Sequence, residues 1–457
     1  MLKDFGKIML GIRYCTLTRQ AWLLNNRIVV IMTLAGVSWS TDPRSPQSEA
    51  GSKHSCDMAR DLPLRSKNVC VIGAGMAGLA ASRELRREGH AVTVMEQRGD
   101  VGGQWLYDPR TDDADPLGAV APVKVHNSMY ASVRLLSPRE AMGFSDFQFL
   151  PRRGRDARRY PGHGEVFCYL KDFCHAFGLM DAVRLNTSVV RVSMALPPPP
   201  PREGSGGGLD VRWNVRSVRV EPDSGKEVAV EEVFDAVVVA NGHYSQPRLP
   251  SINGMEQWRR RQLHSHSYRV PEPFRDEVVV MVGCGDSGLD IALDLCGVAK
   301  EVHLTAKSVE AAMTPALSKM LANHADLHLN PQVDRLCEDG RVVFADGSCV
   351  VADTVIYCTG YSYSLIRKST EIYEFVYKYT DLPRMEEWKR ELIRSSVKNM
   401  IHDRETFRDR DDHSEILREG LQRWYGSAAV QEQEAAAADD DDDAAQLHMP
   451  LLAPSQL

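Results

Sequence analysis

Two glycine-rich turns supply the residues of this chain whose types and spacing point most directly to chemistry. The first is Gly73-Ala-Gly-Met-Ala-Gly78 and the second is Gly283-Cys-Gly-Asp-Ser-Gly288. In a G-x-G-x-x-G turn, the first glycine permits a tight turn, the second lets backbone approach a pyrophosphate, and the third allows a helix to pack closely on a strand. The helix that follows points its N-terminal N–H groups at the phosphates. The spacing therefore predicts two dinucleotide sites.

The segments around the turns are those that such a site needs. Each turn directly follows an apolar run typical of a buried strand, and each leads into a segment with helical spacing and then a second strand. For the first turn these segments are Asn68–Ile72, Leu79–Glu88 and Ala91–Met95, and for the second they are Val278–Val282, Leu289–Cys296 and Glu301–Thr305. Parallel strands joined by short helices predict an α/β fold with two dinucleotide-binding, Rossmann-like domains.

The residues that follow the second strand differ between the two units. Glu96 ends the first unit, where a carboxylate accepts hydrogen bonds from ribose hydroxyls and repels a 2′-phosphate, so this site suits FAD or NAD. No acid ends the second unit, and Lys307 stands there with neighbouring hydroxyls, which suits the 2′-phosphate of NADPH. One site of each kind predicts FAD together with NADPH, and hence hydride transfer to a flavin.

Three further glycine-containing segments fit around a flavin or between domains. The paired glycines of Gly102-Gly-Gln-Trp105 would let backbone pack closely on a ring system. Asn241-Gly-His-Tyr244, after the apolar strand Ala236–Ala240, is interpreted as a crossing between domains, and Thr359-Gly-Tyr361, after Thr354–Cys358, as the crossing back. Glycine after a buried strand is also common in ordinary turns, so both interpretations stay open for each segment.

Taken with all of these segments, the sequence resembles a known family. It looks like a flavin-containing monooxygenase, and most like the plant branch that oxygenates sulfur in glucosinolate side chains. The resemblance covers about residues 66–425. It is carried by Gly73–Gly78, Val101-Gly-Gly-Gln-Trp105, Ser137-Pro-Arg-Glu-Ala-Met-Gly-Phe144, Asn241-Gly-His-Tyr-Ser-Gln-Pro-Arg248, His264-Ser-His-Ser-Tyr-Arg269, Gly283–Gly288 and Cys358-Thr-Gly-Tyr361.

The resemblance implies an FAD domain into which a smaller NADP domain is inserted. It also implies that NADPH reduces the flavin, that O2 adds at flavin C4a, and that the hydroperoxide gives one oxygen atom to a soft nucleophile. That nucleophile would be a thioether sulfur or an amine nitrogen of a small molecule. Such flavin-borne chemistry needs little acid–base help from the protein, which agrees with the lack of an obvious catalytic dyad in the sequence.

Two departures from the family pattern bear on activity. Leu136 stands at the usual position of an asparagine that contacts flavin and NADP, and it offers no donor or acceptor. Tyr361 is followed almost at once by Glu371–Tyr379 and Glu386–Lys398, which resemble the family's far C-terminus, so a stretch that normally completes the FAD domain is missing. Two alternatives therefore stay open: an uncoupled NADPH oxidase, and a catalytically impaired remnant.

Composition excludes several other classes. The net charge of -7 offers no polybasic face for nucleic acid. Ten cysteines without a C-x-x-C pair argue against a zinc ribbon or a disulfide framework, and the pair His264 and His266 is too weak a signal for a metal site. The longest apolar run, Ile28–Val37, is about half of what a bilayer needs. A cytoplasmic protein is therefore expected, with membrane association or signal-led secretion less favoured.

These interpretations assign ranges and residues. The expected ranges are a poorly structured extension at 1–65, the first part of the FAD domain at 66–250, the NADP domain at 251–351, a shortened return to the FAD domain with C-terminal helices at 352–425, and a disordered acidic tail at 426–457. The residues expected to hold FAD are Gly73, Gly75, Gly78, Glu96, Gly103, Gln104 and Trp105. Those expected to hold NADPH are Gly283, Gly285, Ser287, Gly288 and Lys307.

Overall fold

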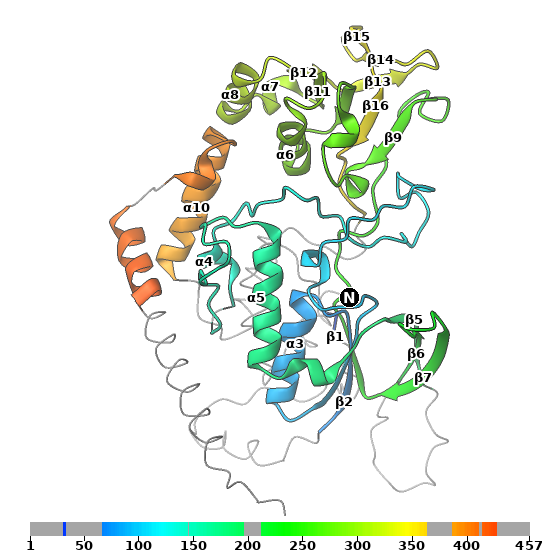
Figure 1. Ribbon diagram of the computed structural model, residues 1–457, viewed down its shortest axis with the longest axis vertical. Helices are drawn as coiled ribbons and strands as arrows, with labels where there is room; N and C mark the ends of the chain where they lie inside the picture. Colours follow the sequence, from blue (N-terminus) through cyan, green and yellow to red (C-terminus); the bar gives the residue numbers. More distant parts are fainter. Residues whose placement is uncertain are drawn as a thin grey trace, which may run out of the picture.

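The computed structural model describes residues 31–32, 66–144, 146–195, 212–362, 386–410 and 414–426. Two five-stranded sheets form the framework, and each is covered on one face by helices and on the other by a three-stranded meander (Figure 1). This arrangement confirms the α/β fold with two Rossmann-like units. None of the helices among the described residues has the length and apolar composition of a membrane span.

The first sheet has the strand order β1-β8-β2-β3-β4. Its strands are parallel except β1, which pairs antiparallel with β8. Side chains alternate across the sheet, so that Val69 and Val71 pack toward the helices while Cys70 packs toward the meander. The bounds are β1 Ile31–Met32, β2 Asn68–Ile72, β3 Ala91–Met95, β4 Val183–Arg184, β8 Ala236–Val239, α3 Met76–Arg87 and α5 His163–Ala176, with the meander β5 Thr187–Met194, β6 Trp213–Val220 and β7 Glu227–Phe234.

The second sheet repeats this plan with the strand order β12-β11-β10-β16-β9, and all of its pairs are parallel. In both units the chain runs from the first strand through the glycine turn and a helix, and later through a meander into a strand beside the first. The bounds are β9 Arg261–His264, β10 Val278–Val282, β11 Glu301–Ala306, β12 Leu327–Pro331, β16 Thr354–Tyr357, α6 Asp286–Leu295, α7 Val309–Ala312 and α8 Pro315–Asn323, with the meander β13 Val333–Leu336, β14 Arg341–Phe344 and β15 Cys349–Val351.

One expected boundary is wrong. The strand Thr354–Cys358 was expected to lie in the return to the FAD domain that begins at residue 352, but β16 pairs with β10 and β9 of the second sheet. All four residues of β16 are buried, and a strand that is apolar on both faces carries no mark of the sheet it joins. The second unit therefore extends at least to Tyr357, and the crossing back begins after it.

The flanking segments match the expectations only where the structure describes them. β5 and β6 pair antiparallel on either side of a proline- and glycine-rich run, Pro197–Gly208, which lies outside the described residues. The expected C-terminal helix Glu386–Lys398 appears as α10, Glu387–His402, followed by a helix at residues 415–426. The expected segment Glu371–Tyr379 lies outside the described residues, as do the acidic tail from Ser427 and all of residues 1–65 except β1.

The same steric constraint fixes both glycine turns. Gly73 has φ +101° and Gly283 has φ +115°, a region that side chains disfavour. A Cβ on Gly73 would lie 2.6 Å from the carbonyl oxygen of Ala240, which follows β8, and a Cβ on Gly283 would lie 2.6 Å from that of Cys358, which follows β16. In each unit the neighbouring strand therefore closes over the turn, and only glycine fits beneath it.

We predict that Gly288→Ala destabilises the second unit. The added Cβ would lie 2.2 Å from the carbonyl oxygen of Gly283, so α6 must shift away from β10, at a cost of about 1–3 kcal/mol for an overpacked site. The matched control is Gly164→Ala in α5, where nothing lies within 4 Å, and it should stay within about 1 kcal/mol of the unmodified protein. Urea unfolding would measure both, and equal effects would contradict the packing described.

Candidate cofactor sites

The first glycine turn forms an open cradle at the N-terminus of α3. Gly75 is the N-cap residue, and neither a capping side chain nor an acidic residue of the first turn satisfies the N–H groups there. A Cβ on Gly103 would lie 2.7 Å from Cα of Gly75, so the two glycine segments pack backbone against backbone. N–H groups without a side-chain cap, beside two glycine segments in backbone contact, fit the pyrophosphate of FAD.

Glu96 lies beside this cradle, immediately after β3. Its carboxylate is buried and accepts hydrogen bonds from the N–H of Ala74 at 2.7 Å and from the N–H of Arg98 at 3.0 Å. Burial raises the pKa of the carboxyl, and these hydrogen bonds oppose that rise. A carboxylate has about four lone-pair sites, so acceptor capacity remains for ribose hydroxyls. The structure thus brings Glu96 to the glycine turn, as its place in the sequence predicts.

The loop that carries Gly103, Gln104 and Trp105 is held by a residue that sequence reasoning missed. The side chain of Asn127, which is 1% exposed, donates to the carbonyls of Gln104 at 2.8 Å and Leu106 at 2.9 Å. Its Oδ1 accepts from the N–H of Met129 at 2.9 Å. Trp105 packs against the core of the first unit. Nothing in the sequence marks Asn127, because the two carbonyls that it binds lie 23 and 21 residues away along the chain.

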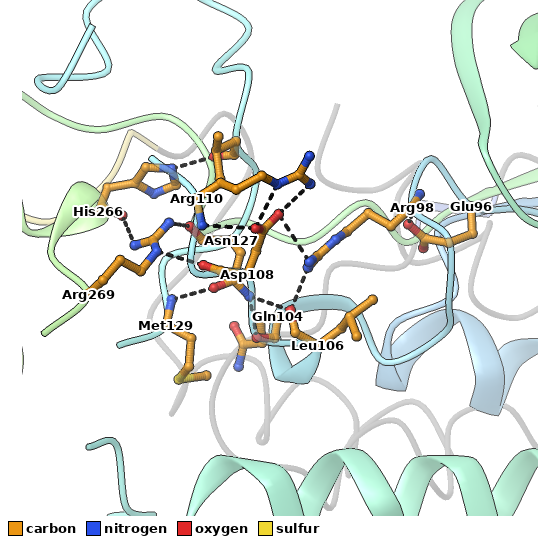
Figure 2. Close-up of polar contacts among 11 residues, drawn as sticks. Glu96, Arg98, Gln104, Leu106, Asp108, Arg110, Asn127, Met129, His266 and Arg269 are labelled. Carbon is orange, nitrogen blue, oxygen red and sulfur yellow. Dashed lines mark hydrogen bonds and ion pairs between the residues drawn. The ribbon is translucent and has the colours of Figure 1, made fainter. Parts of the chain in front are cut away.

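A buried arginine connects this loop to the second unit (Figure 2). Arg269, which follows β9, donates to the carbonyls of Asp108 at 2.8 Å, Asn127 at 2.8 Å and His266 at 2.7 Å. Arg98 donates to the carbonyl of Leu106 at 2.6 Å, on the side of the network toward Glu96. A guanidinium has donors for several carbonyl partners at once, so Arg269 joins the loop of the first unit to the segment after β9 in the second.

The second glycine turn is more open than the first. Gly285 is the N-cap residue of α6 without a side-chain cap, and a Cβ placed on it would meet nothing within 4 Å. Ser287 is exposed in the first turn of α6, and Gly288 lies under the turn against Gly283. The open backbone at Gly285 is a cradle that a second pyrophosphate would fill. These residues therefore fit NADPH at this turn.

Lys307 lies at the end of β11, where the sequence placed it. Its side chain is exposed, and within the described part of the chain no carboxylate lies at ion-pair distance from it. Thr305 donates its hydroxyl proton to the carbonyl of Met281, whereas the Ser308 oxygen accepts from the N–H of Ala311 and its own O–H can still donate. Lys307 is therefore the cation of this loop that stays available to a 2′-phosphate.

The two expected crossings run side by side at the junction of the units. Pro247 and Tyr361 form an antiparallel bridge, and Arg248 bonds to the backbone carbonyl of Thr359 at 2.9 Å. The Tyr361 ring meets those of His264 and His266 edge to face, with centroids 5.4 and 5.9 Å apart. Burial lowers the pKa of both histidines to about 4. Both are therefore neutral near pH 7 and line a packed junction.

A C-terminal segment, residues 403–410, fastens the two units together. Arg404 is 3% exposed and bonds to Asp286 at 2.9 Å and Asp290 at 3.1 Å, both on α6. Arg408 bonds to Asp290 on the same helix and donates to the carbonyl of Leu135 in the first unit at 3.0 Å. We call this segment the strap. It neutralises the acidic side of α6 and passes next to Leu136, the residue at the usual asparagine position.

Family membership follows from the matched residues. A family model described as "Flavin-binding monooxygenase-like" matches residues 66–319, which are more than half of the chain and include both glycine turns. This chain belongs to that family. The resemblance seen in the sequence is thereby confirmed, and the flavin in the family's description agrees with the cofactor expected at the first turn.

Curated relatives agree with this assignment. The chain is 57% identical over 302 residues to the flavin-containing monooxygenase FMO GS-OX-like 8 of Arabidopsis thaliana, a match covering 66% of this chain and 63% of the relative. It is 44% identical over 306 residues to FMO GS-OX4 of the same plant, covering 66% and 61%. The chain thus spans less than two thirds of the length of these relatives.

Solved structures show the same fold. The S-allyl-L-cysteine S-oxygenase of Allium sativum superposes with a TM-score of 0.67 at 31% identity, covering 80% of this chain and 100% of that chain. Tmm of a Pelagibacter strain gives a TM-score of 0.59 at 20% identity, covering 76% and 94%, and shows the fold alone.

We predict that stability falls as pH drops below about 6.5, the pKa of histidine in an unfolded chain. His264 and His266 are neutral in the fold down to about pH 4, so the unfolded state binds more protons between these values. Each histidine should add about 1.4 kcal/mol per pH unit to the slope of the unfolding free energy in that window.

Urea unfolding at several pH values would measure this slope. His266→Gln removes one titrating group and should reduce the slope by about 1.4 kcal/mol per pH unit. His175→Gln, on the exposed face of α5, is the control and should leave the slope unchanged. A slope that His266→Gln does not alter would show that the buried junction does not exclude the charged histidine.

Proposed function

We propose that this protein is an FAD- and NADPH-dependent monooxygenase that transfers one oxygen atom of O2 to a soft nucleophile. The observation that carries the proposal is the pair of glycine turns, one beside the buried acid Glu96 and one beside the exposed base Lys307. Thioether sulfur is the substrate class favoured first, because the Allium sativum relative is an S-oxygenase by name. Amine nitrogen is the second class, since it is also a soft nucleophile.

Each part of the protein has a task in this function. The chemistry that bound flavin supplies is to accept hydride from NADPH and to activate O2. The N–H groups at the start of α3 and Glu96 bind and orient the flavin nucleotide, while α6 and Lys307 bind NADPH. Asn127 and Arg269 fix the loop Gly103–Trp105 relative to the second unit, so that the two cofactors are held in one arrangement. A proximity effect of this kind is a main source of rate acceleration.

A second candidate function is an NADPH oxidase that releases peroxide without oxygenating a substrate. It is favoured by Leu136, which cannot hydrogen-bond to bound oxygen or cofactor where an asparagine is usual. A non-catalytic remnant is the remaining alternative from the sequence. The segment after Tyr361 on which that hypothesis rests continues outside the described residues from 363 to 385. Retention of flavin by the purified protein separates the remnant from both enzymes.

We predict that Lys307→Ala weakens NADPH binding by about 10- to 100-fold, since a charge-assisted contact contributes about 1.5–3 kcal/mol. NADH lacks the 2′-phosphate, so its affinity should change little. Lys300→Ala, an exposed lysine before the same strand, is the matched control and should change neither. Titrating NADPH and NADH against each variant measures both affinities. Equal losses of affinity for the two nucleotides would show that Lys307 does not contact the 2′-phosphate.

We predict that the unmodified protein consumes NADPH in excess of product, and that Leu136→Asn brings the two closer together. The amide restores a donor and an acceptor beside the reactive centre. Leu136→Met keeps an apolar side chain of similar volume and should leave the ratio unchanged. The measurement is the ratio of sulfoxide formed to NADPH oxidised, with S-allyl-L-cysteine as the thioether. A ratio already near one, or no gain in the asparagine variant, would contradict the role given to Leu136.

A further inference from the structure

A cysteine, a histidine and an aspartate converge at the outer end of α6, away from its glycine turn. Cys296 is the C-cap residue of α6 and His324 is the C-cap residue of α8, while Asp326 precedes β12. One potential ligand atom from each of these three residues lies within 4.8 Å of the other two, and all three side chains are half-buried. Thiolate, imidazole and carboxylate are the ligand types that Zn²⁺ takes in proteins.

The surrounding structure favours a cation at this point. Two helices, α6 and α8, end at the cluster, and neither has a basic residue in its last turn. The partial negative charge of both C-termini is therefore left uncompensated by their own side chains. One oxygen of Asp326 accepts from the N–H of Gly297 at 2.8 Å, which fixes the carboxylate against the end of α6.

The strap supplies the partner that a metal-binding histidine commonly has. Glu405 accepts from Nε2 of His324 at 2.7 Å and from the side chain of Asn323 at 2.7 Å. A carboxylate bonded to one ring nitrogen orients a histidine and raises the basicity of the other nitrogen toward a metal. Within the described residues, Nδ1 of His324 and Sγ of Cys296 have no hydrogen-bond partner.

We propose that Cys296 Sγ, His324 Nδ1 and one oxygen of Asp326 bind a thiophilic divalent cation of the Zn²⁺ class, with Glu405 orienting the histidine. Ligand atoms around tetrahedral Zn²⁺ lie about 2.0–2.3 Å from the ion, so the cluster must contract by about an ångström. The bound cation joins the ends of α6 and α8, and through Glu405 it fastens the strap to the second unit. This site is distinct from both cofactor cradles.

A second cluster, Glu301, His303 and His328, competes for the same cation. There both ring nitrogens of His303 already face oxygen atoms, Nε2 that of Glu301 at 3.2 Å and Nδ1 that of Asn330 at 3.1 Å. A cation at that cluster would have to displace one of these contacts, and it would lack a sulfur ligand. The cluster at Cys296 is therefore the stronger site for a thiophilic ion.

Titration of the reduced, chelator-treated full chain with Co²⁺ tests the proposal. We expect one ion per chain, with a thiolate-to-cobalt charge-transfer band and the visible bands of tetrahedral Co²⁺, and displacement by Zn²⁺. Cys296→Ser should abolish the charge-transfer band, whereas Cys349→Ser, an exposed cysteine of the same unit, should leave it intact. Asp326→Asn and Glu405→Gln should weaken binding by about 10- to 100-fold or more.

Circular dichroism of each variant controls for folding, and alkylation gives a readout that needs no cysteine variant. Zn²⁺ should slow alkylation of Cys296 in the unmodified protein and leave that of Cys349 unchanged, as measured by mass spectrometry of peptides. An octahedral Co²⁺ spectrum without a thiolate band would overturn the proposal. So would binding that His303→Gln abolishes while Cys296→Ser retains it, because the ion would then belong to the other cluster.

Discussion

In each unit the rest of the structure depends on one close contact. It joins the glycine turn to the carbonyl group just after the neighbouring strand, β8 or β16. The carbonyl oxygens of Ala240 in the first unit and Cys358 in the second lie 2.6 Å from where a Cβ on Gly73 or Gly283 would stand. This close approach seats the glycine turn against the strand, and the turn aims the N-terminus of α3 or α6 outward. The consequence is a helix N-terminus of the kind that binds phosphate, formed twice from the same backbone geometry.

The two cradles can serve one reaction only if the two units keep a fixed relative position. Three connections at the junction provide it: the paired crossings at Pro247 and Tyr361, the carbonyl contacts of Arg269, and the strap with Arg404 and Arg408. Buried arginines are suited to this because a guanidinium has five donors in a rigid plane and saturates several acceptors at once. Losing one such contact leaves a buried carbonyl or carboxylate without a hydrogen-bond partner, which costs free energy. The junction therefore resists small displacements of one unit against the other.

The sequence predicted the features that depend on local pattern. The strands around both turns, the helices after them and the positions of Glu96 and Lys307 follow from short-range periodicity and glycine spacing, and they lie where expected. Features that depend on pairing across the fold were missed. Thr354–Tyr357 was assigned to the wrong unit because a strand apolar on both faces fits either sheet. Asn127 and Arg404 went unnoticed because their partners are far away in the chain.

We propose that one chain holds FAD and NADPH in two cradles arranged for hydride transfer. The most direct test is anaerobic mixing of the flavin-loaded protein with NADPH while the absorbance of oxidised flavin is followed. We predict that NADPH bleaches the flavin, and that NADH does so only at much higher concentration, because NADH lacks the 2′-phosphate that we propose Lys307 binds. A protein that takes up no flavin, or whose flavin stays oxidised in NADPH, would contradict this proposal.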